Sequence, residues 1–203
     1  SKPHKYWDFS AFEISFDEQL MTFCVDTTGN KVSQLYYKFF FDNKIHEIIN
    51  PDGHKILSYH SYGGTVAISK NSNIIFYLTI DKTQRTNRAW YYNIYEPTKH
   101  YCILYEPNAE FTLTINSTSD NQYIIISSSS KNTNICYLVN VDKDLNMLTC
   151  IFEEKPHLNY YVDHYNDKWY FLLQEKLKCE ITCADSLHGK QEVIFPHKKD
   201  RTI

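Results

Sequence analysis

Four strongly apolar runs divide the chain at nearly regular intervals. They begin at Leu20, Ile74, Tyr123 and Trp169, which are 54, 49 and 46 residues apart. Each run follows a short polar turn, and before that turn lies a segment in which apolar and polar residues alternate. Alternation is typical of a strand with one covered face, whereas a near-continuous apolar run is typical of a strand covered on both faces. We therefore predict four β-hairpins.

Each hairpin is followed by two further strand-like segments, so the predicted unit is a four-stranded antiparallel sheet. A unit of this kind that repeats every ~40 to 50 residues is the sequence signature of a β-propeller blade. The predicted blades cover residues 9–50, 65–107, 111–154 and 160–196. The segment from Pro51 to Gly64 is the longest predicted connection, and no space remains for long helices. We expect the four blades to form an open arc within a larger fold.

The composition supports an all-β chain and excludes several kinds of partner. Of the 203 residues, 16% are aromatic and only 5 are glycine, which favours strands. The net charge of -3 is spread without a basic stripe, so we do not expect nucleic-acid binding. No apolar run approaches the ~20 residues that span a bilayer, and the first ten residues lack the apolar core of a signal sequence. We therefore expect no membrane association.

The six cysteines predict a reducing environment. They lie within strand-like runs and form no C-x-x-C pair, so a zinc site is not expected. An even number of cysteines permits disulfides, but buried free thiols are the simpler interpretation and indicate a cytoplasmic protein. The residues are Cys24, Cys102, Cys136, Cys150, Cys179 and Cys183.

Short polar residues occupy the turn between the first two strands of each unit. We align Asp17, Asn73, Asp120 and Asp167 at this position. Such side chains can accept a hydrogen bond from the backbone two residues further on. Their recurrence predicts turn residues and not a pair of catalytic carboxylates.

The segment NYYVDHYNDKWYFLL, residues 159–173, places Asp163 beside His164 and so resembles part of a catalytic triad. Neighbouring side chains of an extended strand point to opposite faces, however, and cannot bond to one another as the acid and base of a triad do. We predict a blade hairpin here, with His164 packed or hydrogen-bonded as a structural residue.

Other catalytic and ligand-binding signals are weak. Ser61 precedes Tyr62-Gly63-Gly64, but Tyr59 stands where the first glycine of a G-x-S-x-G elbow is required, and a strand follows where a helix is needed. Residues 26–30, DTTGN, resemble a calcium-loop fragment, yet a hairpin turn with positive φ at Gly29 or Asn30 explains them. No phosphate-binding glycine motif occurs. We assign no catalytic, cofactor-binding or metal-binding residue and no cofactor.

Several segments, in order along the chain, resemble oligopeptidase B of the prolyl oligopeptidase family of serine peptidases. Residues 12–40 resemble its early propeller blades, and a later blade pattern, F-Y-x-x-x-D-x-x-x-R-x-x-x-x-W, is matched by Phe76, Tyr77, Asp81, Arg85 and Trp90. Further blades are matched by residues 103–130 and by residues 160–173. That last pattern contains Val162, Asp163, His164, Tyr165 and Tyr170.

The resemblance implies about four blades of a seven-bladed propeller. In the family this propeller covers a C-terminal α/β-hydrolase domain, whose serine, aspartate and histidine cleave short peptides, after basic residues in oligopeptidase B. The resemblance carries none of those three residues over to this chain. It implies a non-catalytic cap whose partners are the hydrolase domain of the same protein and short peptide substrates.

Two other functions fit the same pattern. A non-enzymatic propeller could serve as a scaffold that binds proteins with one face. A propeller glycosidase would need two carboxylates ~5 to 9.5 Å apart, which the turn-bound aspartates make a weak alternative.

Overall fold

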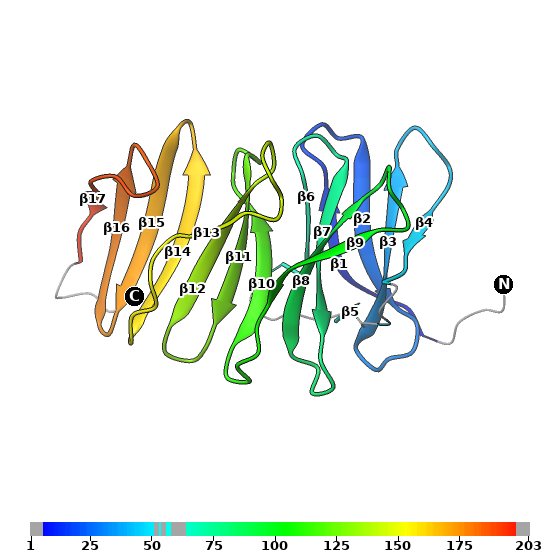
Figure 1. Ribbon diagram of the computed structural model, residues 1–203, viewed down its shortest axis with the longest axis horizontal. Helices are drawn as coiled ribbons and strands as arrows, with labels where there is room; N and C mark the ends of the chain where they lie inside the picture. The colour runs from blue at the N-terminus through cyan, green and yellow to red at the C-terminus, as the bar shows by residue number, and fades with distance from the viewer. Residues whose placement is uncertain (1–5, 51–52, 54–55, 58–63, 198–203) are drawn as a thin grey trace.

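A computed structural model describes residues 6–50, 53, 56–57 and 64–197, and all regular structure in these residues is β-strand. Four antiparallel sheets follow one another along the chain and lie in a row (Figure 1). Within each sheet, the strands pair in the order in which they occur in the sequence. The predicted all-β fold of four-stranded antiparallel units is therefore confirmed.

The strands of each sheet have similar lengths, with a shorter fourth strand in most sheets. The first sheet contains β1 (Asp8–Ile14), β2 (Leu20–Asp26), β3 (Val32–Phe39) and β4 (His46–Ile48), and β5 (Ile56–Leu57) also pairs with β3. The second contains β6 (Val66–Ile68), β7 (Ile74–Ile80), β8 (Thr86–Asn93) and β9 (His100–Tyr105). The third contains β10 (Thr112–Ser117), β11 (Tyr123–Ser129), β12 (Asn134–Asn140) and β13 (Leu148–Cys150). The fourth contains β14 (Leu158–Tyr165), β15 (Lys168–Glu175), β16 (Lys178–Ala184) and β17 (Glu192–Phe195).

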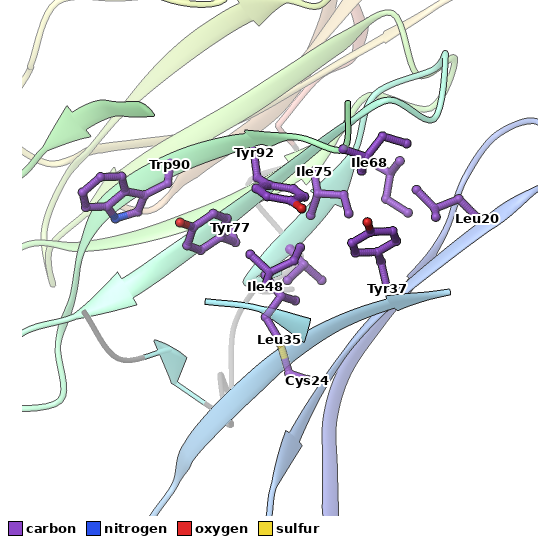
Figure 2. Close-up of a cluster of buried hydrophobic side chains, with 12 residues drawn as sticks. Leu20, Cys24, Leu35, Tyr37, Ile48, Ile68, Ile75, Tyr77, Trp90 and Tyr92 are labelled. Atoms are coloured by element: carbon purple, nitrogen blue, oxygen red, sulfur yellow. The ribbon is translucent and has the colours of Figure 1, made fainter. Parts of the chain in front are cut away.

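Hydrophobic side chains fill the space between neighbouring sheets. Alternate residues of β7 point to opposite faces, so Ile75 and Tyr77 pack against the first sheet while Phe76 and Leu78 pack against the third. Figure 2 shows the first of these interfaces, where Tyr77 and Ile75 face side chains from the first sheet such as Leu35. All seven residues of β7 are buried, as predicted for a strand covered on both faces.

The two end sheets have one face each that no other described sheet covers. On the outer face of the first sheet, Phe9 and Phe12 are 67% and 68% exposed. In the fourth sheet, Trp169 and Phe171 of β15 are buried against the third sheet, but other residues of the same strand are partly or fully exposed. The prediction of near-continuous burial is thus wrong for β15, whose outer face has no described sheet beyond it, whereas β2 of the first sheet is nearly all buried, with the rings of Phe9 and Tyr36 packed on Phe23.

The chain enters and leaves each sheet at the same ends of the strands because each sheet is built on four consecutive antiparallel strands, to which the first sheet adds the short β5. The upper edge in Figure 1 carries the turn between the first and second strands and the loop between the third and fourth. The lower edge carries the turn between the second and third strands and the connections between sheets. β1 begins at the lower edge, where Asp8 pairs with Asp26, and β17 runs toward it.

The upper-edge turns of the first three sheets share one backbone conformation. In each, the residue at the first position bonds through its N–H to the carbonyl five residues on, and its hydroxyl accepts the N–H of that same residue. The fourth position always has positive φ and is occupied by Glu18, Ser72 and Asn121, with φ of 57°, 55° and 57°. The chain therefore places side chains where glycine is usually favoured.

Replacing Glu18 by glycine is expected to stabilise the protein by about 0.5–1 kcal/mol, because glycine adopts positive φ without the clash of a Cβ atom. The neighbouring substitution Gln19→Gly is the control and is expected to destabilise by about 0.5–1 kcal/mol, since Gln19 has no positive φ, the unfolded chain gains entropy, and the exposed hydrogen bond from its side chain to the carbonyl of Asp17 is lost. Urea unfolding of both variants measures the difference. Equal destabilisation by the two substitutions would contradict this account of the turn.

Candidate functional site at the upper edge between the third and fourth sheets

A buried histidine from the fourth sheet bonds to the third sheet at the upper edge. His164, near the end of β14, is only 4% exposed, and its Nδ1 lies 2.6 Å from Oδ2 of Asp120. Asp120 lies in the β10–β11 turn, where its other carboxylate oxygen accepts the Thr118 hydroxyl and the N–H of Gln122. A single carboxylate therefore closes its own turn and binds the next sheet.

The hydrogen bonds around Asp120 determine the tautomer of His164. Partial burial raises the pKa of the Asp120 carboxyl, but the hydrogen bonds from Gln122, Thr118 and His164 outweigh burial and hold that pKa below its usual value. An ionised carboxylate can only accept hydrogen bonds, so Nδ1 of His164 carries the proton and donates it. In the neutral ring, Nε2 then keeps its lone pair, which is the arrangement that carboxylate–histidine pairs use to orient an imidazole.

The side chain of Asp163 does not bond to the imidazole of His164; it accepts the backbone N–H of His164 at 2.8 Å and bonds to a different residue of the β10–β11 turn. Its carboxylate accepts the backbone N–H of Ser119 at 2.8 Å and also the Ser119 hydroxyl. The expectation that Asp163 and His164 form no dyad, and that His164 is a packed and hydrogen-bonded residue, agrees with this geometry. Both side chains nevertheless bind the β10–β11 turn, each through a different residue.

Aromatic rings enclose the imidazole and form one wall of a cleft. The ring centroid of His164 lies 4.5 Å from that of Trp169 and 5.0 Å from that of Tyr123. These residues line a cleft of about 470 Å³, together with residues of the β12–β13 loop, the β14–β15 turn and the start of the β16–β17 loop. The cleft combines aromatic surface, a buried imidazole and exposed carboxylates.

The structure corrects part of the predicted alignment of turn residues. Asp17 and Asp120 each accept the N–H two residues further on, from Gln19 and Gln122, as predicted. The residue of the second sheet at this position is Asn71 and not Asn73, because Ser69 matches Ser15 in the shared turn.

The fourth sheet has a shorter turn, in which Asn166 and Asp167 have φ of 52° and 58°. Asn71 lies two residues after the turn hydroxyl and three before the apolar run, as Asp17 and Asp120 do, so a consistent count along the sequence aligns Asn71 correctly. The contact of Asp120 with His164 has no signal in a single sequence, because the two residues are 44 positions apart.

Arg85 and Asp81 of the family-like pattern have a structural role at the lower edge. Arg85 Nε donates to Asp81 at 3.0 Å, and its terminal nitrogens donate to the carbonyls of Glu106, Asn108 and Phe111 in the connection to the third sheet. Burial opposes ionisation of Asp81, but its four hydrogen bonds from Thr83 and Arg85 lower its pKa to about 2. These two residues also line a second cleft of about 600 Å³, but their polar atoms are occupied by these contacts.

The other candidate residues also have structural roles or lie outside the residues that the structure describes. Asp26 accepts backbone N–H groups from Thr28, Gly29 and Lys31, and Gly29 supplies the positive φ of this hairpin. In the described part of the chain, no group of three or more His, Cys, Asp or Glu side chains could hold a metal ion. Ser61 lies outside the described residues. The neighbouring Gly64 is required by packing, since a Cβ atom there would lie 2.3 Å from the carbonyl oxygen of Ile115.

Only two of the six cysteines are buried. Cys24 and Cys136 lie in the core, and burial raises their pKa to about 12 and about 11, which keeps these thiols protonated. Cys102 and Cys150 are exposed, so the expectation of six buried thiols is wrong for the short outer strands β9 and β13. A strand in the middle of a sheet that lies between two other sheets is covered on both faces. The fourth strand is the outermost strand of its sheet and is left partly exposed.

Comparison with known proteins identifies the whole chain with one domain family. Residues 1–203 match the family model described as prolyl oligopeptidase, N-terminal beta-propeller domain. The chain is also 26% identical over 113 residues to "Protease 2" of Moraxella lacunata, a match that covers 55% of this chain and 16% of that protein. The chain therefore spans a small part of the curated relative it matches.

Solved structures with the same fold include two oligopeptidases. The oligopeptidase B of Leishmania major has a TM-score of 0.77 at 19% identity, over 99% of this chain and 28% of its own. The Trypanosoma brucei oligopeptidase B with covalently bound antipain has a TM-score of 0.73 at 19% identity, over 96% of this chain and 27% of its own. Among the described residues, no helix is long and apolar enough to cross a bilayer.

Asp120→Asn is expected to lower the free energy of unfolding at pH 7 by about 1–3 kcal/mol, because charge-assisted hydrogen bonds to His164 and Thr118 are lost or weakened. A carboxyl whose pKa is lower in the folded than in the unfolded state stabilises the fold above its unfolded pKa of about 4, and this stabilisation is lost as the pH falls through the folded value. The difference between wild type and variant should therefore shrink below about pH 4.

The matched control is Asp142→Asn, which removes an exposed carboxylate near the same turn and should change stability by less than about 0.5 kcal/mol. Urea unfolding followed from pH 7 to pH 3 measures both variants. An Asp120→Asn difference that stays constant over this range would contradict the proposed role of the ionised carboxylate.

Proposed function

The chain belongs to the family of prolyl oligopeptidase N-terminal β-propeller domains, and we propose that it is the non-catalytic propeller segment of a serine oligopeptidase. The observation that carries the proposal is the family match over residues 1–203, together with the small share of each oligopeptidase B chain that this chain covers. On this proposal the hydrolytic residues belong to an α/β-hydrolase domain elsewhere in the same protein. The chain itself contributes a cap.

The proposed role of the cap is to restrict access to short peptides. Covering a reaction site excludes water and bulky substrates, and movement between two domains can control entry and release. The four stacked sheets suit this role because their interfaces are filled by side chains and leave each sheet firmly packed against its neighbours. Cleavage after basic residues is proposed from the likeness to oligopeptidase B.

The topology favours one edge for contact with the catalytic domain. Because β1 begins at the lower edge and β17 runs toward it, sequence that precedes β1 or follows β17 departs from this side of the sheets. A domain joined by short linkers therefore lies most readily against the lower edge. The uncovered faces of the first and fourth sheets are proposed to pack against further blades of the same protein.

A cytoplasmic location is the remaining part of the proposal. It is supported by the free thiols of Cys24, Cys136, Cys150, Cys179 and Cys183, because unpaired thiols persist in reducing compartments.

The full-length protein that contains this chain is expected to hydrolyse a short fluorogenic peptide with arginine at the cleavage position. Treatment with a serine-reactive phosphonate should abolish this hydrolysis. The same arginine-containing sequence placed in a loop of a folded protein should be cleaved at least about 100-fold more slowly, because the cap excludes bulky substrates.

The assay has two controls, one for the preference for a basic residue and one for the presence of a reactive serine. A peptide with citrulline in place of arginine tests the preference for a basic residue, and a phosphonate that carries a fluorophore reports whether a reactive serine is present. Absence of both hydrolysis and labelling would overturn the peptidase function and favour the protein-binding scaffold. Equal cleavage of the peptide and the folded protein would overturn the gating role alone.

A further inference from the structure

The upper-edge cleft between the third and fourth sheets offers hydrogen-bond acceptors around an aromatic wall. Trp169 and Tyr123 form the wall, and Asp144, Asp167 and Asp185 contribute carboxylates from three different loops. Lys143 is the one basic side chain among the residues that line the cleft in the described part of the chain. The lining thus has an excess of negative charge.

His164 adds a buried acceptor that points to a ligand. Its side chain is only 5% exposed, and Nδ1 is committed to Asp120. Among the described residues no hydrogen bond joins Nε2 to a partner. Nε2 keeps some contact with solvent, so it is open to the cleft that the ring lines. A histidine held in one tautomer by a carboxylate presents its second nitrogen in a fixed direction.

The surroundings of Tyr123 independently indicate a negative field. Burial raises the pKa of the Tyr123 phenol, and the charges of Asp120, Asp142 and Asp167 raise it further. Lys168 offsets this field only in part, since its contact with Asp185 is 3.5 Å long and both side chains are half or more exposed. Ion pairs with such exposure contribute little and leave the carboxylate available.

The complement of these groups is a cation with several hydrogen-bond donors and a flat surface. The absence of any metal-binding group of three or more side chains in the described residues argues against a bare metal ion. A guanidinium group is planar, always charged, able to donate to carboxylates and to an imidazole lone pair, and it stacks on aromatic rings. We propose that this cleft binds the guanidinium group of an arginine side chain in a peptide.

The choice of a peptide as the source of the arginine rests on the proposed function, whereas the choice of a guanidinium rests on the cleft. The test uses the full-length protein and a non-cleavable peptide of D-amino acids that contains arginine and a diazirine photo-crosslinker. Mass spectrometry should locate the crosslinks in residues 143–147 or 185–187. A peptide with citrulline in place of arginine should give at least about tenfold less labelling at these residues, because it is neutral.

Asp167→Asn combined with Asp185→Asn is expected to raise the half-saturating concentration of the arginine peptide about tenfold. Asparagine suits the left-handed backbone of position 167, and Asp185 is 90% exposed, so these substitutions leave the fold intact. Glu153→Gln combined with Glu154→Gln changes the net charge equally at exposed positions outside the cleft lining and should leave the concentration unchanged.

Crosslinks elsewhere, equal labelling by the citrulline peptide, or an unchanged half-saturating concentration in the Asp167→Asn/Asp185→Asn variant would each overturn the inference. Hydrolysis of the fluorogenic peptide by the same preparation tests the proposed function separately. Retained hydrolysis without labelling of the cleft would reject the arginine site alone, whereas loss of hydrolysis with labelling retained would reject the peptidase function and leave the site.

Discussion

The structure depends on the burial of apolar sheet faces between neighbouring sheets. A single sheet of four short strands cannot bury enough apolar surface to offset the loss of chain entropy, so the stable unit is a stack. β7 shows the result most clearly, because its alternate side chains belong to two different cores. The uncovered outer faces of the first and fourth sheets follow from the same constraint, since a row has two ends.

Hydrogen bonds between neighbouring sheets fix how the sheets are positioned relative to one another. The apolar interfaces alone would allow neighbouring sheets to slide, whereas hydrogen bonds from one sheet to the next fix their relative height. At the upper edge these include Ser72 to Asp17 and His164 to Asp120, and at the lower edge Arg85 binds three carbonyls of the following connection. Buried polar groups with satisfied partners specify one arrangement among several that hydrophobic contact would accept.

The strands and their grouping could be predicted from the sequence because both depend on local patterns. The apolar run at Ile74 and the alternation before it follow directly from a period of two residues and from burial on both faces. The exposure of β15 could not be predicted, since its sequence resembles the other second strands and its burial depends on what covers the outer face of the last described sheet. The pairing of His164 with Asp120 was equally hidden, because it depends on how two sheets stack and not on spacing along the chain.

The even number of strands in sequence order has a consequence for how such a chain can change its length. Since the backbone arrives at and departs from one side, an entire sheet can be duplicated or deleted at the level of the gene without reversing the course of the remaining polypeptide. The loss of a single strand would invert every later segment. Such a chain therefore gains or loses whole sheets. The connections between sheets are the places where an insertion or a deletion preserves the remaining strands.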